Sequence, residues 1–168
     1  TPKGVAVPHR GVARLVFGQD YMQFGPDRIF LQLSPVSFDA STLEIWGALL
    51  HGGQCVLYPG RIPELEMLGH ILAASQVNAL WLTSSLFNMV IDEKPEILSS
   101  IRTILTGGEA LSVPHVRKAV KLLDSVELVN GYGPTERTTF ACCYPIPKSI
   151  PDNLKSRSEE HTSELQSR

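Results

Sequence analysis

The chain has 168 residues, of which 43% are hydrophobic, and a formal net charge of −2 at pH 7. This composition is typical of a globular domain and gives no indication of a nucleic-acid partner. The sequence has no run of eighteen apolar residues and no basic-then-apolar leader, so neither membrane insertion nor secretion is expected. The odd number of cysteines, Cys55, Cys142 and Cys143, favours a reduced, cytoplasmic protein.

Helical and strand-like patterns alternate along the chain. Apolar spacing predicts helices near 9–17, from a Ser41 N-cap to 52–53, over 63–74, from Ser84 and Ser85 through 90, and over 114–123. Buried strands are predicted at 28–33, 54–58, 78–83, 101–106 and 126–129. This alternation predicts an α/β fold with a mostly parallel sheet flanked by helices. Trp46 and Trp81 are expected to belong to its core.

The stretch Asn130-Gly131-Tyr132-Gly133-Pro134-Thr135-Glu136 follows the last predicted strand. Its two glycines allow a tight turn close to a ligand, and the tyrosine ring between them offers a stacking face. The Thr135 hydroxyl and the Glu136 carboxylate suit a phosphate oxygen and a hard divalent cation. The stretch therefore indicates a nucleotide site, with an ordinary turn and a surface carboxylate as the alternative.

A second candidate is Asp39 in Phe38-Asp39-Ala40-Ser41, at a predicted junction between a strand and a helix. In open α/β sheets, ligands bind at that edge. The alternative is that Asp39 only caps the helix or places a favourable charge at its N-terminus.

Together these motifs resemble the adenylation domains of nonribosomal peptide synthetases, members of the adenylate-forming ligase superfamily. Residues 1–5 resemble the second half of the family's phosphate-binding loop, and 107–109 match by position a loop that lies against adenine. The resemblance covers about 1–147 and implies an incomplete piece of the large N-terminal subdomain. Residues 148–156 then form a connector, and 157–168 resemble a translated sequencing adapter that is not native.

The resemblance also implies roles for single residues. Thr135 and Glu136 would be catalytic, and Glu136 would also bind magnesium. ATP or AMP would be bound by Lys3, Gly107, Gly108, Glu109, Asn130, Gly131, Tyr132, Gly133 and Thr135. The substrate's α-ammonium group would pair with Asp39, and its side chain would lie among Ala40, Leu43, Trp81, Leu105, Gly107, Gly131, Thr139 and Phe140.

The set of expected pocket residues contains no charged side chain, which disfavours acidic and basic substrates. Trp81 and Phe140 would fill the volume that a large aromatic substrate needs, whereas Gly107 and Gly131 would restore some room. The set thus points to a branched aliphatic amino acid, and it resembles the pockets of valine-activating modules. Isoleucine is the close competitor, because one methylene in an apolar pocket contributes only about 1–3 kcal/mol of discrimination.

The implied reaction joins the amino acid to ATP as aminoacyl-AMP, with Mg²⁺, and then loads it on the phosphopantetheine arm of a carrier protein. The implied partners are the carrier-protein and condensation domains of the parent synthetase. Residues 1–147 alone are expected to be inactive, because the family's smaller C-terminal subdomain supplies a catalytic lysine. The alternatives are a fragment of an acyl-CoA synthetase-like acid ligase, whose family usually lacks the aspartate motif, or a noncatalytic pseudo-domain.

Overall fold

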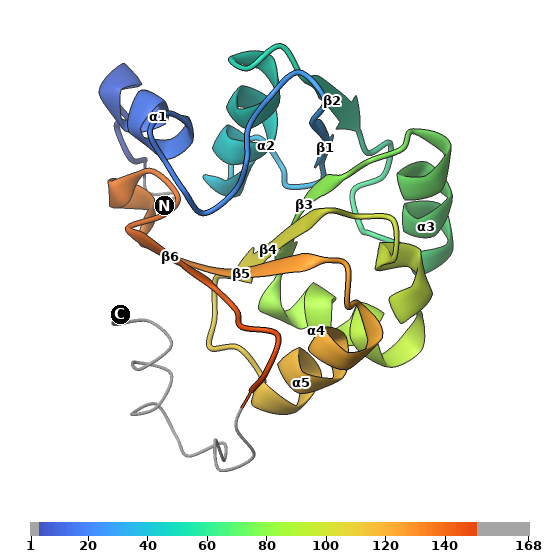
Figure 1. The fold of residues 1–168 in the computed structure, drawn as a ribbon. Coiled ribbons are helices and arrows are strands. Elements are labelled where there is room, and N and C mark those ends of the chain that lie inside the picture. Colours follow the sequence, from blue (N-terminus) through green and yellow to red (C-terminus); the bar gives the residue numbers. More distant parts are fainter. Residues whose placement is uncertain (1–3, 151–168) are drawn as a thin grey trace.

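The computed structural model describes residues 4–150, which form a six-stranded sheet with helices on both faces (Figure 1). The strands, in the spatial order β2-β1-β3-β4-β5-β6, are β1 (Ile29–Gln32), β2 (Gln54–Leu57), β3 (Ala79–Thr83), β4 (Thr103–Gly107), β5 (Glu127–Tyr132) and β6 (Cys142–Pro145). All neighbours pair in parallel except β5 and β6, which are antiparallel. The helices are α1 (His9–Val16), α2 (Ala40–Leu49), α3 (Leu65–Ala74), α4 (Ser84–Glu93) and α5 (Val113–Leu122), with short 3₁₀ turns η1 (Pro95–Leu98) and η2 (Thr135–Arg137). The predicted α/β fold is confirmed.

Two apolar clusters hold the layers together, one on each face of the sheet. Successive strand residues point to opposite faces, so each buried strand contributes to both clusters. Leu80 and Leu82 of β3 pack into the cluster that contains residues of α3, α4 and α5. Ala79 and Trp81 pack into the cluster that contains residues of α1 and α2. Figure 1 shows these two groups of helices on opposite sides of the sheet, which covers both faces of its parallel strands.

The helix caps differ from those predicted. Helix α2 begins at Ala40, so its N-cap is Asp39, which already has helical dihedral angles, and not the predicted Ser41. The Ser41 hydroxyl instead donates to the Phe38 carbonyl inside the first turn. At α4 the cap is Thr83, whose side-chain oxygen accepts a hydrogen bond from the Leu86 amide. A serine or threonine near a helix start can make several such local hydrogen bonds, so the sequence did not single out the residue that caps.

Three further differences from the predicted elements concern β5, β6 and Trp46. Strand β5 continues through Tyr132 instead of ending at 129, because its second edge pairs with β6, a strand that is not among those predicted. Pro145 is compatible with β6, because it lies at the end of an edge strand. Trp46 is 42% exposed and is therefore not a core residue, whereas Trp81 is buried as predicted.

Some predictions fall on residues outside the described range. These are the phosphate-loop residue Lys3, most of the predicted connector and the whole of the predicted adapter tail. Within residues 4–150, no helix is both long enough and apolar enough to cross a membrane.

Candidate functional site

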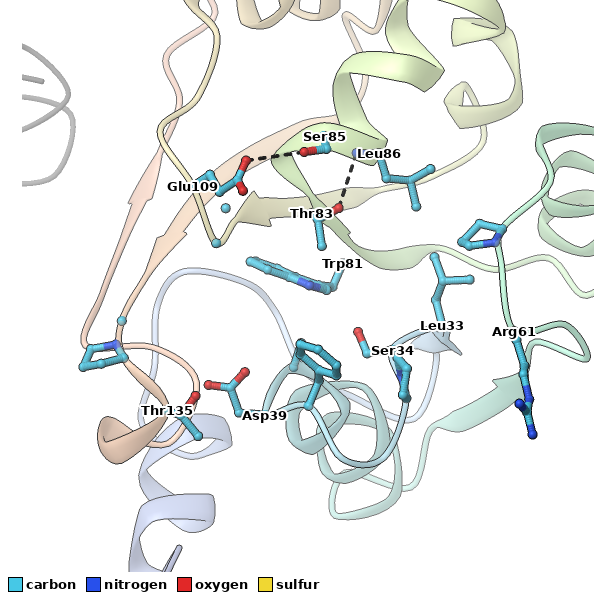
Figure 2. Close-up of a pocket in the computed structure, with 18 residues that line it drawn as sticks. Leu33, Ser34, Asp39, Arg61, Trp81, Thr83, Ser85, Leu86, Glu109 and Thr135 are labelled. Atoms are coloured by element: carbon cyan, nitrogen blue, oxygen red, sulfur yellow. Dashed lines mark hydrogen bonds between the residues drawn. The ribbon is translucent and has the colours of Figure 1, made fainter. Parts of the chain in front are cut away.

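A cavity of about 700 Å³ opens at the carboxyl ends of the parallel strands (Figure 2). Its walls come from the carboxyl ends of the parallel strands and the segments that follow β1, β2, β3, β4 and β5. This is the edge where open α/β sheets bind ligands. The lining residues are Leu33, Ser34, Pro35, Phe38, Asp39, Ala40, Arg61, Pro63, Trp81, Thr83, Ser85, Leu86, Gly107, Gly108, Glu109, Gly133, Pro134 and Thr135.

The cavity brings together part of the set predicted from sequence. Eight predicted residues line it: Asp39, Ala40, Trp81, Gly107, Gly108, Glu109, Gly133 and Thr135. The other predicted residues within the described range do not line it: Leu43, Leu105, Asn130, Gly131, Tyr132, Glu136, Thr139 and Phe140. The cavity therefore contains both the aspartate motif and the start of the Thr135–Glu136 pair.

Asp39 lies at the start of α2, and Figure 2 shows it on the same side of the cavity as Thr135. Its side chain makes no capping hydrogen bond, so the side-chain capping alternative does not hold. Within residues 4–150 the carboxylate has no hydrogen-bond or ion-pair partner. Because Asp39 is half-buried and has no partner, its carboxylate would be stabilised by a cationic group of a ligand.

Trp81, which lines the cavity, packs against Phe140, and this aromatic pair is called the cavity floor below. The rings of Trp81 and Phe140 are 5.1 Å apart, and both residues belong to the apolar cluster that contains Leu43 and Leu105. Thr139 lies beside this floor and donates a 2.7 Å hydrogen bond to the backbone carbonyl of Asp39. The segment after η2 therefore holds the backbone of Asp39 through Thr139.

The two glycines of the predicted substrate pocket are explained by close packing. A Cβ atom on Gly131 would lie 2.6 Å from Cε1 of Phe140, and one on Gly107 would lie 2.0 Å from the Gly131 carbonyl oxygen. At Gly131 the place of a Cβ atom is thus already filled by the Phe140 ring, and Gly131 does not line the cavity. Gly107 does line the cavity, although the Gly131 backbone lies close to it.

The loop after β4 is held by Ser84 and Ser85 at the start of α4, two serines that the sequence predicts only as helix caps. The Ser84 hydroxyl lies 3.0 Å from the Gly107 carbonyl oxygen and 2.9 Å from that of Glu109. Ser85 donates a longer hydrogen bond, 3.4 Å, to the Glu109 carboxylate (Figure 2). Their position directly after a strand that ends at this edge could have revealed them. Gly108 has a φ of +85° and open space around it, which leaves a flat surface for a ring.

The nucleotide motif follows β5, and its residues Gly133, Pro134 and Thr135 line the cavity. The Tyr132 side chain is 51% exposed, and Glu136 is exposed in η2 directly after Thr135. Residues 4–150 contain no group of three or more His, Cys, Asp or Glu side chains that could hold a metal ion. Glu136 with the neighbouring Thr135 hydroxyl nevertheless fits Mg²⁺, which proteins usually bind through one or two carboxylates together with substrate phosphates and water.

Glu44 supports the cavity wall at Ser34. It is fully buried, and its carboxylate accepts hydrogen bonds from the Ser34 amide and hydroxyl at 3.1–3.2 Å. Burial raises the pKa of Glu44 from 4.5 to about 7, and the hydrogen bonds from Ser34 and Leu33 offset only part of this rise. The native state therefore keeps a proton that the unfolded chain loses near pH 4.5.

We expect this carboxyl group to make stability depend on pH. Its stabilising contribution is complete below pH 4.5 and is lost as pH rises through about 7, with a total of about 3 kcal/mol. Urea unfolding of the complete domain that contains these residues, at pH 5 and pH 8, measures this loss. Glu44→Gln should flatten the pH dependence in that window. An identical pH dependence in both proteins would contradict the assignment.

Comparison with known proteins identifies the class to which this fold and cavity belong. The profile of the AMP-binding enzyme family matches residues 1–162, so the chain belongs to that family. More particularly, the chain is 52% identical over 146 residues to one of the linear gramicidin synthase proteins of Brevibacillus parabrevis, covering 87% of this chain and 2% of that protein. It is 42% identical over 154 residues to tyrocidine synthase 3 of the same organism, covering 91% of this chain and 2% of that protein.

Solved structures show the same similarity. PA1221, a nonribosomal peptide synthetase protein with adenylation and carrier (PCP) domains, superposes with a TM-score of 0.80 at 49% identity, over 83% of this chain and 24% of that chain. The N-terminal subdomain of Klebsiella oxytoca NpsA superposes with a TM-score of 0.81 at 30% identity, over 86% and 38% of the two chains. The chain therefore spans a small part of the curated relatives, and the resemblance to adenylation N-terminal subdomains is confirmed.

Proposed function

We propose that these residues form part of an adenylation domain that activates an amino acid, with valine as the substrate. The observation that carries this proposal is the unpartnered Asp39 carboxylate, which lines the same cavity as the uncharged residues Ala40 and Trp81. An α-ammonium group would satisfy this carboxylate, whereas a plain carboxylic acid would leave it unpaired. The similar synthetases and the PA1221 structure support the same class of reaction.

In this reaction a carboxylate oxygen of the amino acid attacks the α-phosphorus of ATP. The new P–O bond forms as the bond to the bridging oxygen breaks, and pyrophosphate leaves with the electron pair. Asp39 orients the amino acid, while Thr135, on the same side of the cavity, contacts the α-phosphate. The open space at Gly108 and the exposed Tyr132 ring fit adenine. Catalysis by these residues consists mainly of positioning.

When bound, magnesium would supply positive charge to the phosphates, which stabilises the charge that develops during phosphoryl transfer. Glu136 would hold it, because it is the exposed carboxylate next to Thr135. The product would pass to the phosphopantetheine arm of a carrier domain in the cytoplasm. The similarity to PA1221, which contains adenylation and PCP domains, supports a carrier-domain partner.

The choice of valine rests on the cavity floor. Ala40, Trp81 and the supporting Phe140 are uncharged, so a charged substrate side chain packed against them would find no partner among these three residues. The two aromatic rings also limit the depth of the floor, which favours a short branched side chain. Isoleucine would follow closely, because it differs by one methylene.

Pyrophosphate exchange by the complete adenylation domain that contains these residues tests the proposal. The substrates are valine, isoleucine, leucine, phenylalanine, aspartate and the deamino analogue 3-methylbutanoate. We expect the highest kcat/KM with valine and little exchange with 3-methylbutanoate. A preference for phenylalanine or aspartate would refute the pocket assignment. A preference for 3-methylbutanoate would instead indicate an acyl-CoA synthetase-like ligase, and no exchange with any acid would indicate a noncatalytic domain.

A further inference from the structure

The loop from Arg137 to Phe140 has an unusual backbone. Thr138 and Thr139 both have positive φ angles, +59° and +67°. Branched side chains rarely adopt this left-handed region, and each such residue costs on the order of 1–3 kcal/mol. Two consecutive threonines in this conformation need neighbours that hold them there.

Helix α1 supplies those neighbours, although it lies far from the loop in the sequence. The Arg14 side chain reaches the loop and donates through Nη2 to the carbonyl oxygens of Arg137, of Thr138 at 3.4 Å and of Phe140 at 2.8 Å. Hydrogen bonds from a charged donor are about twice as strong as those between neutral groups. One guanidinium group therefore fixes carbonyls on both sides of the two strained threonines.

Steric fit at a second residue of α1 adds to these hydrogen bonds. A Cβ atom on Gly11 would lie 2.4 Å from the Thr138 hydroxyl oxygen, so the helix backbone itself lies against the loop. Gly11 and Arg14 are three residues apart on a helix and therefore share a face. This face of α1 therefore contacts the loop both through the close approach of Gly11 and through the hydrogen bonds of Arg14.

The loop connects the two halves of the site. On one side it continues from Thr135 and Glu136 through hydrogen bonds within η2 and its C-cap. On the other side, Thr139 donates to the Asp39 carbonyl, and Phe140 packs against Trp81. A change in the loop backbone would therefore move both the aspartate and the floor of the cavity.

We propose that Arg14 is a positioning residue for amino-acid binding, which it supports by holding the Arg137–Phe140 loop under Asp39. This inference rests on the proposed function. Arg14 does not line the cavity, so it acts through Thr139 and Phe140 and not by contact with the substrate. Its partners are backbone carbonyls, so its effect comes from the shape of the loop.

The test compares Arg14→Gln, Arg14→Lys and Arg102→Gln in the complete adenylation domain. Gln removes the charge and shortens the side chain, whereas Lys keeps a charged group with several donors. Arg102 is the matched control, because it also joins distant segments through a hydrogen bond to Asp27, but at the amino end of β4. Two quantities are measured: amide hydrogen exchange in residues 134–142, and steady-state pyrophosphate exchange with valine and leucine.

We expect Arg14→Gln to speed hydrogen exchange of the Phe140 and Ala141 amides by about tenfold or more, which is the loss of one charged hydrogen bond. The KM for valine should rise and the preference for valine over leucine should fall, with a smaller change in the KM for ATP. Arg14→Lys should recover most of both losses, and Arg102→Gln should cause neither.

The proposal is overturned if loop exchange is unchanged in Arg14→Gln, if Arg102→Gln gives the same changes, or if the KM for valine stays constant. If the unmodified domain activates no amino acid, the proposed function fails, and Arg14 then has no amino-acid-positioning role. Loop exchange that is still faster in Arg14→Gln would separate that result from a failure of the loop argument itself.

Discussion

Asp39→Asn is expected to reduce kcat/KM for valine by about a hundredfold or more, because breaking a desolvated ion pair by removing one charge costs about 3–5 kcal/mol. The side chain keeps its shape, and no capping hydrogen bond is lost, since the Asp39 side chain makes none. The loss should therefore come from the ammonium contact and not from α2. Pyrophosphate exchange with valine and 3-methylbutanoate measures it, and the ratio between the two acids should fall in the variant.

The matched control for this change is Asp124→Asn, an identical substitution at an exposed residue in the turn that precedes β5. Asp124→Asn should leave pyrophosphate exchange with valine and with 3-methylbutanoate unchanged. Equal rates for Asp39→Asn and the unmodified domain would show that Asp39 does not contact the substrate. A rise in the KM for ATP without a change for valine would assign this carboxylate to the nucleotide side.

Glu136→Gln is expected to lower the rate of adenylation by about a hundredfold at low magnesium, because even supporting residues around a metal are worth about 10–100-fold. Glu136 is exposed, so the substitution should not disturb the fold. Excess magnesium should restore part of the rate, since the phosphates and the Thr135 hydroxyl would still offer oxygen ligands. The measurement is pyrophosphate exchange across a magnesium titration.

Glu93→Gln, at the exposed end of α4, is the control for the loss of one surface carboxylate. It should give the same magnesium curve as the unmodified domain. If Glu136→Gln also gives that curve and the same rate, Glu136 is a surface carboxylate without a role in metal binding.

Much of the fold could be predicted from the sequence, because a parallel sheet buried on both faces leaves a strong apolar pattern. The strands at 78–83 and 101–106 were clear for this reason, and their neighbours in sequence follow from the same alternation. β6 was missed because an edge strand of four residues with a terminal proline has little apolar pattern. Its absence from the prediction also ended β5 too early.

The site residues could be predicted only where they belong to a recognisable sequence motif. Asp39 and Thr135 stand in such motifs, and both line the cavity. Ser84 and Arg14 do not, because their roles depend on carbonyl groups that are distant in sequence and carry no side-chain pattern. The space at Gly131 was hard to predict for a related reason, since an absent side chain does not reveal whether a ligand or the protein itself fills the space.

The contact between Gly131 and Phe140 has a consequence for redesign of substrate choice. Because the phenylalanine ring already occupies the place of a Cβ atom at residue 131, the two positions cannot vary independently. Under the proposed function, a smaller side chain at 140 would admit a larger substrate, and the same change would make a side chain at 131 tolerable. Substrate range in this scaffold would therefore evolve by paired replacements, with residue 140 changing before residue 131.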